Sequence, residues 1–256
     1  MKLLAKVGGT LLDAVESRSR VARELASVSG AGHQMTVVHG GGKQMTRFLK
    51  ELGVESRFVG GLRVTTPETI DAVLKVFAGS VNKQLVASLV AAGVNAVGLS
   101  GIDAALVEAE RLNEELGAVG KPVRSNARLL EVLSGAGYLP VVACVAGDRQ
   151  GHIYNVNADQ MAVACAAGFH AEMLVFLTDV DGVLGPERNV IPVLTAAGCQ
   201  QLIQDGHATG GMQAKLNAAT EALRQGVPRV VIAPGSAENI LQRLVNGELV
   251  GTRIEH

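Results

Sequence analysis

The sequence contains no tryptophan, and aromatic residues make up only 3% of its 256 residues. A surface that stacks the bases of single-stranded nucleic acid needs several aromatic rings, so this shortage argues against such a surface. An excess of either charge is also missing, because 23 basic side chains balance 24 acidic ones to give a formal net charge of −1. This balance argues against a nucleic-acid coat and against a polybasic membrane-binding surface.

Cysteine is scarce and scattered. The three cysteines are Cys144, Cys165 and Cys199, and no two of them form a C-x-x-C motif. An odd and sparse set of cysteines does not predict a disulfide framework or a zinc site. We expect three small buried thiols instead.

Long uncharged apolar runs are missing as well. Residues 1–6 lead into glycines too soon to contain the apolar core of a signal peptide. The richest apolar region, residues 161–177, contains His170 and Glu172, whereas a membrane-spanning helix needs about 18 or more apolar residues. We therefore expect a soluble, cytoplasmic protein.

Apolar residues are nevertheless abundant, at 48% with a mean hydropathy of +0.27, which is enough for a sizeable core. Six short runs rich in valine and leucine do not alternate with polar residues, as expected for strands buried on both faces. The predicted fold class is α/β, an open three-layer α-β-α sandwich with a mainly parallel central sheet. The predicted strands are residues 3–7, 35–39, 96–99, 139–145, 173–178 and 229–233.

Residues typical of helix ends mark two helices in the first half. Thr66 followed by Pro67 predicts the start of a helix that runs toward Gly79. A separate helix is predicted over residues 82–92, with Gly93 as its end.

The second half contains two similar patterns. Asn157 predicts the cap of a helix over residues 158–167, with Gly168 as the residue that ends it. A further helix is predicted over residues 211–224, ended by Gly226.

One domain is predicted over residues 1–256, with two lobes that share a continuous sheet. The best boundary lies near residues 168–171, which gives lobes of residues 1–169 and 170–256. Residues 107–125 contain mixed charges, two glycines and a proline, which predict a hairpin outside the main sheet.

Several of the 31 glycines stand where predicted strands end. Lys6 precedes residues 8–9, and His39 precedes the three glycines of residues 40–42. Glycine lets backbone N–H groups approach an anion closely, and a lysine beside them adds a point charge. Two plainer interpretations stay open: a tight turn with a surface lysine, and a histidine that serves as a structural hydrogen-bonding group.

Polar segments in mid-chain suit an anionic or amide-containing ligand. Arg63, after two glycines, suits bidentate capture of a carboxylate, although an exposed loop arginine stays open. Asn155 suits a polar substrate, and Asp159 suits the orientation of positive side chains. The Asn-x-Asn-x-Asp pattern lacks the glycine and glutamate of a calcium loop.

Two later segments suit a nucleotide. Residues 179–184 follow a predicted strand, and a nucleotide lies at such a strand end in open α/β sheets. Thr209 and two glycines open a helix that carries Lys215 one turn inside, which together suit a phosphate group. An ordinary Asp-Gly turn and a solvated lysine are the alternatives.

The order and spacing of these motifs resemble the amino-acid kinase family over nearly the whole chain. The most discriminating segments are His39-Gly40-Gly41-Gly42, Gly61-Leu62-Arg63-Val64-Thr65 and Asn155-Val156-Asn157-Ala158-Asp159-Gln160. Among the family's members, the chain resembles those that use ATP to phosphorylate the side-chain (γ) carboxylate of N-acetyl-L-glutamate. The products are N-acetyl-L-glutamyl 5-phosphate and ADP, in arginine biosynthesis.

The resemblance implies a role for each matching residue. The N-terminal lobe would bind the acyl amino acid, and the C-terminal lobe would bind ATP, with Mg²⁺ carried by the nucleotide phosphates. Lys6 and Lys215 would stabilise the transferring phosphoryl group, and Asp159 would orient both lysines. The acyl amino acid would contact Gly41, Gly42, Arg63 and Asn155. The N–H groups of Gly8 and Gly9 would donate to the transition state. The nucleotide would contact Asp179, Val180, Asp181, Gly182, Val183, Leu184 and Thr209.

The resemblance also implies a homodimer without nucleic-acid or membrane partners. The sequence starts at the first predicted strand, whereas the arginine-inhibited relatives carry an extra N-terminal helix. We therefore expect an arginine-insensitive dimer.

Three alternatives remain at this point. A kinase of the same fold could act on another acid or phosphate, such as glutamate, aspartate, an aminoadipate derivative or UMP. A non-catalytic nucleotide-binding regulator could share the scaffold, but Lys6, Asp159 and Lys215 are all present. A purely structural module gives no reason for glycine clusters at strand ends.

Overall fold

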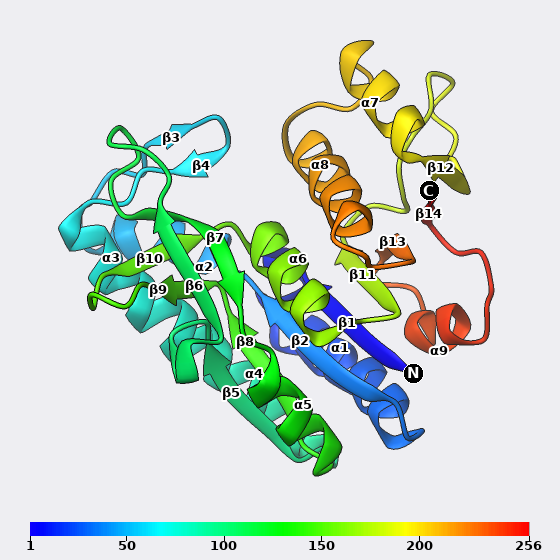
Figure 1. The fold of residues 1–256 in the computed structure, drawn as a ribbon, viewed down its shortest axis with the longest axis horizontal. Coiled ribbons are helices and arrows are strands. Elements are labelled where there is room, and N and C mark those ends of the chain that lie inside the picture. Colours follow the sequence, from blue (N-terminus) through cyan, green and yellow to red (C-terminus); the bar gives the residue numbers. More distant parts are fainter. Residues whose placement is uncertain (256) are drawn as a thin grey trace.

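Each of the six predicted strands contributes a strand to one eight-stranded sheet (Figure 1). The computed structural model describes residues 1–255. Neighbouring strands of this sheet are parallel except β13 and β14, so the predicted fold class is confirmed. Across the sheet, the strands are β12 (Val193–Thr195), β14 (Thr252–Glu255), β13 (Val230–Pro234), β11 (Met173–Thr178), β1 (Lys2–Val7), β2 (Gln34–His39), β8 (Leu139–Ala143) and β5 (Ala96–Ser100).

Helices cover both faces of the sheet, which explains the apolar runs without polar alternation. Helices α1 (Val15–Gly30), α4 (Asn82–Ala91) and α9 (Ile240–Val245) pack on one face. Helices α5 (Arg128–Gly135), α6 (Ala158–Phe169) and α8 (Gly210–Arg224) pack on the other. Every residue of β11 is buried between these layers. The remaining α-helices are α2 (Gly42–Glu51), α3 (Pro67–Val73) and α7 (Ala196–Gln204).

A second, smaller sheet contains the predicted hairpin of residues 107–125. Strands β6 and β7 pair antiparallel, and β9 and β10 close them into a four-stranded barrel. The strand predicted over residues 139–145 is therefore divided, because β8 ends at Ala143 and β9 begins at Val145. The bounds are β6 (Val107–Arg111), β7 (Val119–Ser125), β9 (Val145–Gly147) and β10 (Ile153–Val156), and a separate hairpin joins β3 (Phe58–Val59) to β4 (Leu62–Arg63).

The helix that begins after Thr66 is longer than predicted. Its cap is confirmed, because the Thr66 side chain accepts a hydrogen bond from the Thr69 N–H. The expected end at Gly79 is wrong: the chain continues through a π-helical segment, Leu74–Val81, directly into α4. A glycine weakens a helix without breaking it when packing supports the turn.

This continuous helix, Pro67–Ala91, is long and apolar enough to cross a membrane, by length and composition alone. It packs on the sheet and buries Val73, Phe77 and Leu85 in the core. The region that the sequence marks as most apolar, residues 161–177, is divided between α6 and β11.

The three cysteines are free and buried, which confirms the expectation of buried thiols. Burial raises the pKa of Cys144 and the pKa of Cys165 to about 12. A thiol with so high a pKa carries little of the reactive thiolate at neutral pH.

Gly168 does not end α6, contrary to the expectation. The helix continues to Phe169, and His170 ends it in a left-handed conformation at φ 54°. A Cβ on Gly168 would lie 3.0 Å from Ser125 Cβ and 3.3 Å from Ala127 Cβ. This glycine therefore permits close packing of α6 on the end of β7.

We predict that Gly168→Ala lowers the free energy of unfolding by about 1 kcal/mol. The two neighbouring Cβ atoms are fixed to the backbone, and overpacking typically costs about 1–3 kcal/mol, which outweighs the gain of up to about 1 kcal/mol for alanine in a helix. Gly30, the last residue of α1, has no atom within 4 Å of its Cβ position. Gly30→Ala should therefore be neutral or stabilising. Urea denaturation of both variants tests this, and a Gly168→Ala protein as stable as the original would contradict it.

Candidate active site

The residues predicted to bind anions gather where the parallel strands end. Lys6, near the end of β1, lies opposite Val38 of β2 and Phe176 of β11. The chain leaves β1 toward β2 on one side and later returns to β11 on the other. Open α/β sheets bind ligands at the carboxyl ends of the strands where the strand order reverses in this way.

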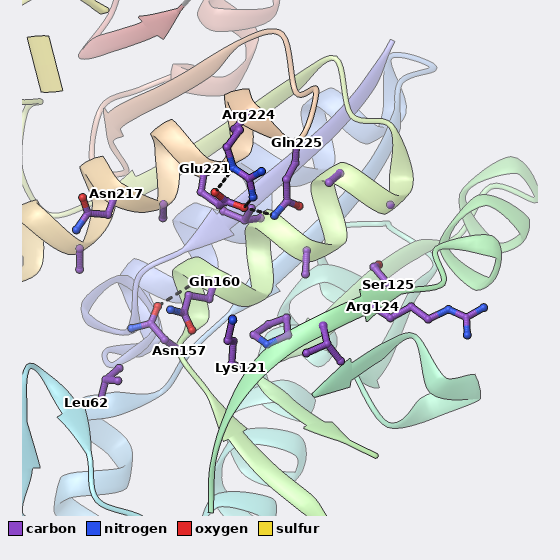
Figure 2. A pocket seen from close by; sticks show the side chains of 18 of the residues that line it. Leu62, Lys121, Arg124, Ser125, Asn157, Gln160, Asn217, Glu221, Arg224 and Gln225 are labelled. Carbon is purple, nitrogen blue, oxygen red and sulfur yellow. Dashed lines mark hydrogen bonds and ion pairs between the residues drawn. The ribbon is translucent and has the colours of Figure 1, made fainter. Parts of the chain in front are cut away.

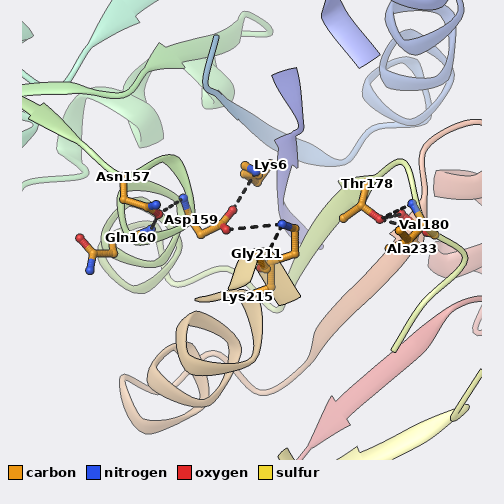
Figure 3. A network of polar contacts seen from close by, with 9 residues as sticks. All are labelled: Lys6, Asn157, Asp159, Gln160, Thr178, Val180, Gly211, Lys215 and Ala233. Atoms are coloured by element: carbon orange, nitrogen blue, oxygen red, sulfur yellow. Dashed lines mark hydrogen bonds and ion pairs between the residues drawn. The ribbon is translucent and has the colours of Figure 1, made fainter. Parts of the chain in front are cut away.

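Two lysines and one carboxylate form the centre of this edge (Figure 3). The Lys6 Nζ lies 2.8 Å from one oxygen of Asp159, and the Lys215 Nζ lies 3.9 Å from the other. The Lys6 and Asp159 side chains are each 9% exposed, and that of Lys215 is 21% exposed. One carboxylate thus orients two ammonium groups that come from opposite ends of the sequence.

Helix ends hold these charges in place. Asn157 caps α6 as predicted, because its side-chain oxygen accepts hydrogen bonds from the N–H groups of Asp159 and Gln160. This cap fixes the backbone of Asp159 in the first turn of α6. Lys215 lies one turn inside α8, and its Nζ donates to the Gly211 carbonyl at 3.4 Å.

The glycines of the first two strand ends approach each other closely. A Cβ on Gly9 would lie 3.4 Å from the Gly42 nitrogen and 3.7 Å from the Gly41 nitrogen. Gly42 is the first residue of α2, where N–H groups lack partners within the helix. We call residues 40–42 the glycine nest.

Gly8 differs from its expected role as a donor to a bound phosphoryl group. Its N–H donates to the Leu177 carbonyl at 3.0 Å and so extends the pairing of β1 with β11. Gly9, which opens a 3-10 turn over Gly9–Leu12, has no partner within that turn for its N–H.

Arg63 is a buried cation at the base of the β3–β4 hairpin. Gly60 and Gly61 turn this hairpin with positive φ angles of 56° and 80°, which only glycine adopts readily. The guanidinium donates to the Gly42 carbonyl at 3.2 Å, to Thr46 Oγ1 at 2.7 Å and to the Ser56 hydroxyl.

No ion pair of residues 1–255 includes Arg63, although it is only 8% exposed. Burial lowers its pKa below the usual value. A buried charge with neutral partners alone gains from binding an anion. The exposed-loop interpretation of this arginine is therefore wrong.

Asn155 is joined to the Arg63 segment through Thr65, to which the sequence assigned no role of its own. Its side-chain nitrogen donates to Thr65 Oγ1 at 3.0 Å, and the Thr65 hydroxyl donates to the Arg63 carbonyl at 3.0 Å. Thr65 is fully buried. Thr65 pairs with the segment just before β7, and β10 pairs with β7, so segments far apart in the sequence make this contact and no local pattern indicated it.

The loop after β11 divides into exposed and buried residues. The exposed residues are Asp179, Val180, Asp181 and Leu184. Gly182 and Val183 are buried, and the Val183 N–H donates to Thr252 Oγ1 at 2.8 Å. Thr178 holds the start of the loop by hydrogen bonds to the Val180 backbone (Figure 3). These two buried residues shape the loop, and the exposed ones can contact a ligand.

A groove of about 710 Å³ continues from the hairpin tip between β7, α6 and α8 (Figure 2). Its lining includes Leu62, Lys121, Asn157, Asn217 and Glu221. It therefore adjoins the site between elements that come from both halves of the sequence.

The described residues contain no group of three His, Cys, Asp or Glu side chains arranged to hold a metal ion. Asp159, the buried acid of the site, is paired with two lysines.

Paired lysines, an orienting carboxylate and glycine-lined strand ends define a phosphoryl-transfer protein on an open α/β sheet. The model of the Amino acid kinase family matches residues 1–234, and the chain belongs to this family. The resemblance noted in the sequence is thereby confirmed.

Two curated relatives are acetylglutamate kinases. That of Solibacter usitatus is 65% identical over 254 residues and that of Acidobacterium capsulatum 45% over 257, and each match covers 99% of both chains. Among solved structures, N-acetylglutamate synthase from Neisseria gonorrhoeae, complexed with coenzyme A and N-acetyl-glutamate, gives a TM-score of 0.88 at 26% identity. That match covers 100% of this chain and 59% of the synthase chain.

Proposed function

We propose that this protein transfers the γ-phosphoryl group of ATP to the side-chain carboxylate of N-acetyl-L-glutamate, a step of arginine biosynthesis. The products are N-acetyl-L-glutamyl 5-phosphate and ADP. The observation that carries this proposal is the Lys6–Asp159–Lys215 arrangement at the strand ends. The substrate assignment is supported by the 65% identical acetylglutamate kinase, which matches over 99% of both chains.

The proposed reaction needs charge stabilisation and no general base. A side-chain carboxylate is ionised at pH 7, because its ordinary pKa is about 4. One of its oxygens forms the new bond to the γ-phosphorus while the bond from that phosphorus to the bridging oxygen breaks, and the electron pair leaves on ADP. In a loose transition state the charge lies on the three equatorial oxygens, so positioned cations and N–H donors provide most of the catalysis.

The two lysines approach that charge from opposite sides in this proposal. Lys6 acts from the side of the acyl amino acid and Lys215 from the nucleotide side, where it lies one turn inside α8. Asp159 holds both ammonium groups through its two oxygens. The N–H groups of Gly9, Gly41 and Gly42 complete the donor set.

Arg63 and Asn155 recognise the acyl amino acid. The buried guanidinium binds its α-carboxylate by charge-assisted hydrogen bonds. Asn155 holds the amide or α-carboxylate region, with its own orientation fixed through Thr65. The glycine nest lies beside this subsite, since Arg63 also donates to the Gly42 carbonyl.

ATP binds mainly to residues 170–256 and the acyl amino acid to residues 1–169 in this proposal. The exposed part of the loop Asp179–Leu184 and Thr209, at the start of α8, contact the nucleotide. Mg²⁺ would enter with the nucleotide, would be held largely by its phosphates, and would lower their charge.

A cytoplasmic, arginine-insensitive homodimer completes the proposal. Strand β5 forms one edge of the sheet, and residues Ala96–Leu99 are only partly buried within a single chain. An unpaired edge is a ready surface for a second copy.

The activity itself is tested by a coupled ADP-release assay on N-acetylglutamate, glutamate, aspartate and UMP. We expect turnover of N-acetylglutamate, because Arg63 and Asn155 suit an acylated amino acid. We expect the same rate in the presence of millimolar arginine. Activity on free glutamate alone would overturn the substrate, and inhibition by arginine would overturn the expected insensitivity. Absence of turnover on all four would favour a non-catalytic regulator.

Removal of either lysine should impair the chemical step. We expect Lys6→Ala and Lys215→Ala to lower kcat by about 100-fold or more, as loss of one transition-state donor typically does. Lys75→Ala is the matched control, because its side chain is 62% exposed and pairs with Asp71 on the helix surface. Near-normal kcat in both test variants, measured by ADP release, would refute the assigned roles.

Removal of Arg63 should affect the acyl amino acid rather than the nucleotide. A charge-assisted hydrogen bond is worth about 1.5–3 kcal/mol, so Arg63→Ala should raise the KM for N-acetylglutamate by about 10- to 100-fold. The KM for ATP should change little. Arg57→Ala is the control, since Arg57 is exposed next to the same hairpin. A rise in the KM for ATP alone would contradict the role of Arg63.

A further inference from the structure

His39 lies directly before the glycine nest and is fully buried. Its Nδ1 lies 2.8 Å from the Gly40 carbonyl oxygen, and its Nε2 lies 3.0 Å from the side-chain nitrogen of Asn82. Both ring nitrogens are therefore engaged. Burial lowers the pKa of His39 to about 4, so the ring is neutral at pH 7.

The surroundings of Asn82 determine which ring nitrogen carries the proton. The Asn82 side-chain nitrogen also lies 2.9 Å from the Val141 carbonyl, and only an N–H group can bond to that oxygen. The second hydrogen of that nitrogen lies between His39 Nε2 at 3.0 Å and the Leu99 carbonyl at 3.4 Å, and the shorter contact is to His39, so Nε2 accepts. The proton of the neutral ring is on Nδ1, which donates to the Gly40 carbonyl.

The hydrogen bond from His39 Nδ1 to the Gly40 carbonyl determines the direction of the Gly41 N–H group. In a planar trans peptide, the C=O and the N–H point in opposite directions. With the Gly40 carbonyl held by the buried ring, the Gly41 N–H points away from it. The Gly41 and Gly42 nitrogens lie 3.7 and 3.4 Å from the Cβ position of Gly9, whose N–H belongs to the proposed donor set.

The helix Pro67–Ala91 carries Asn82 and also packs against the glycine nest. Asn82 follows its π-helical segment, and that segment supplies Phe77 and Val81 at the back of the nest. A Cβ on Gly41 would lie 2.9 Å from a Phe77 ring carbon and 3.1 Å from Val81 Cγ2. Gly98 of β5 leaves room for Asn82, whose side-chain oxygen lies 2.0 Å from the Cβ position of that glycine.

We propose that His39 and Asn82 are positioning residues that aim the Gly41 N–H at the transferring phosphoryl group. Asn82 selects the Nδ1–H tautomer of His39, and His39 holds the Gly40–Gly41 peptide in the required orientation. The inference rests on the proposed function, since it assigns the nest to phosphoryl transfer. Neither residue contacts a substrate, and His39 takes up no proton in the reaction.

Two substitutions of His39 separate its two hydrogen bonds. His39→Asn places an amide N–H near the position of Nδ1 and can keep the bond to the Gly40 carbonyl. His39→Gln reaches toward Asn82 and loses the Nδ1 donor. Both leave some empty volume in the core, so thermal unfolding is measured for each and kcat is expressed per folded enzyme.

We expect His39→Gln to lower kcat by about 10- to 100-fold. This loss is no greater than the loss of about 100-fold or more that removal of a transition-state donor causes. His39→Asn should keep kcat within about fivefold of the original, and the KM for ATP should change little in either. Asn82→Leu replaces the amide with a side chain of similar volume. It should lower kcat by more than His39→Asn does and by less than His39→Gln does. Equal losses in His39→Asn and His39→Gln, or a normal kcat in His39→Gln, would overturn the proposal.

A second measurement does not depend on turnover. Long-range ¹H–¹⁵N spectra of the histidine rings in the original protein should show His39 as the Nδ1–H tautomer, and the Nε2–H tautomer would overturn the proposal. His39→Gln should shift the Gly41 and Gly42 amide resonances more than His39→Asn does, and equal shifts would count against it. If the original protein shows the Nδ1–H tautomer but does not phosphorylate N-acetylglutamate, the proposed function fails while the positioning of the nest stands.

Discussion

The site depends on one buried carboxylate that pairs with two ammonium groups. Asp159 meets Lys6 from the first strand and Lys215 from a helix near the end of the chain. A buried charge is costly without a partner, so this contact requires β1, α6 and α8 to pack in one relative position. The cap at Asn157, the reversal of strand order at β1 and the approach of α8 all serve that requirement.

The local charge of the site contrasts with the near-zero charge of the chain. Lys6, Lys215 and Arg63 together exceed the single negative charge of Asp159, whereas the whole protein carries −1. The surplus is concentrated where backbone N–H groups are also directed. Fixed positive charge and directed N–H groups can therefore stabilise a carboxylate acceptor and a phosphoryl group, which suits a transfer that needs no base.

Much of the fold could be read from the sequence because buried parallel strands and helix caps leave strong local patterns. The six predicted strands exist, and the caps at Thr66 and Asn157 are confirmed. Two helix ends were wrong, at Gly79 and Gly168. Gly79 lies inside a π-helical segment that continues into the next helix, and Gly168 permits close packing, yet each has the local appearance of a glycine that ends a helix. The closure of β9 and β10 with the hairpin also escaped prediction, because distant segments make that pairing.

For the site, the sequence by itself determined which candidate catalytic and binding residues are present. It also indicated that many of them lie at strand ends. It indicated Lys6, Arg63, Asp159 and Lys215, since charged residues beside glycines, strand ends and helix starts have a recognisable chemistry. The resemblance implied that Asp159 orients both lysines, and both ion pairs are present in the structure. Only the tertiary structure decided that the Gly8 N–H belongs to the sheet and that His39 is held by Asn82. The physical reason is that hydrogen bonds and ion pairs depend on distances of a few ångströms, and packing sets those distances between residues far apart in the chain.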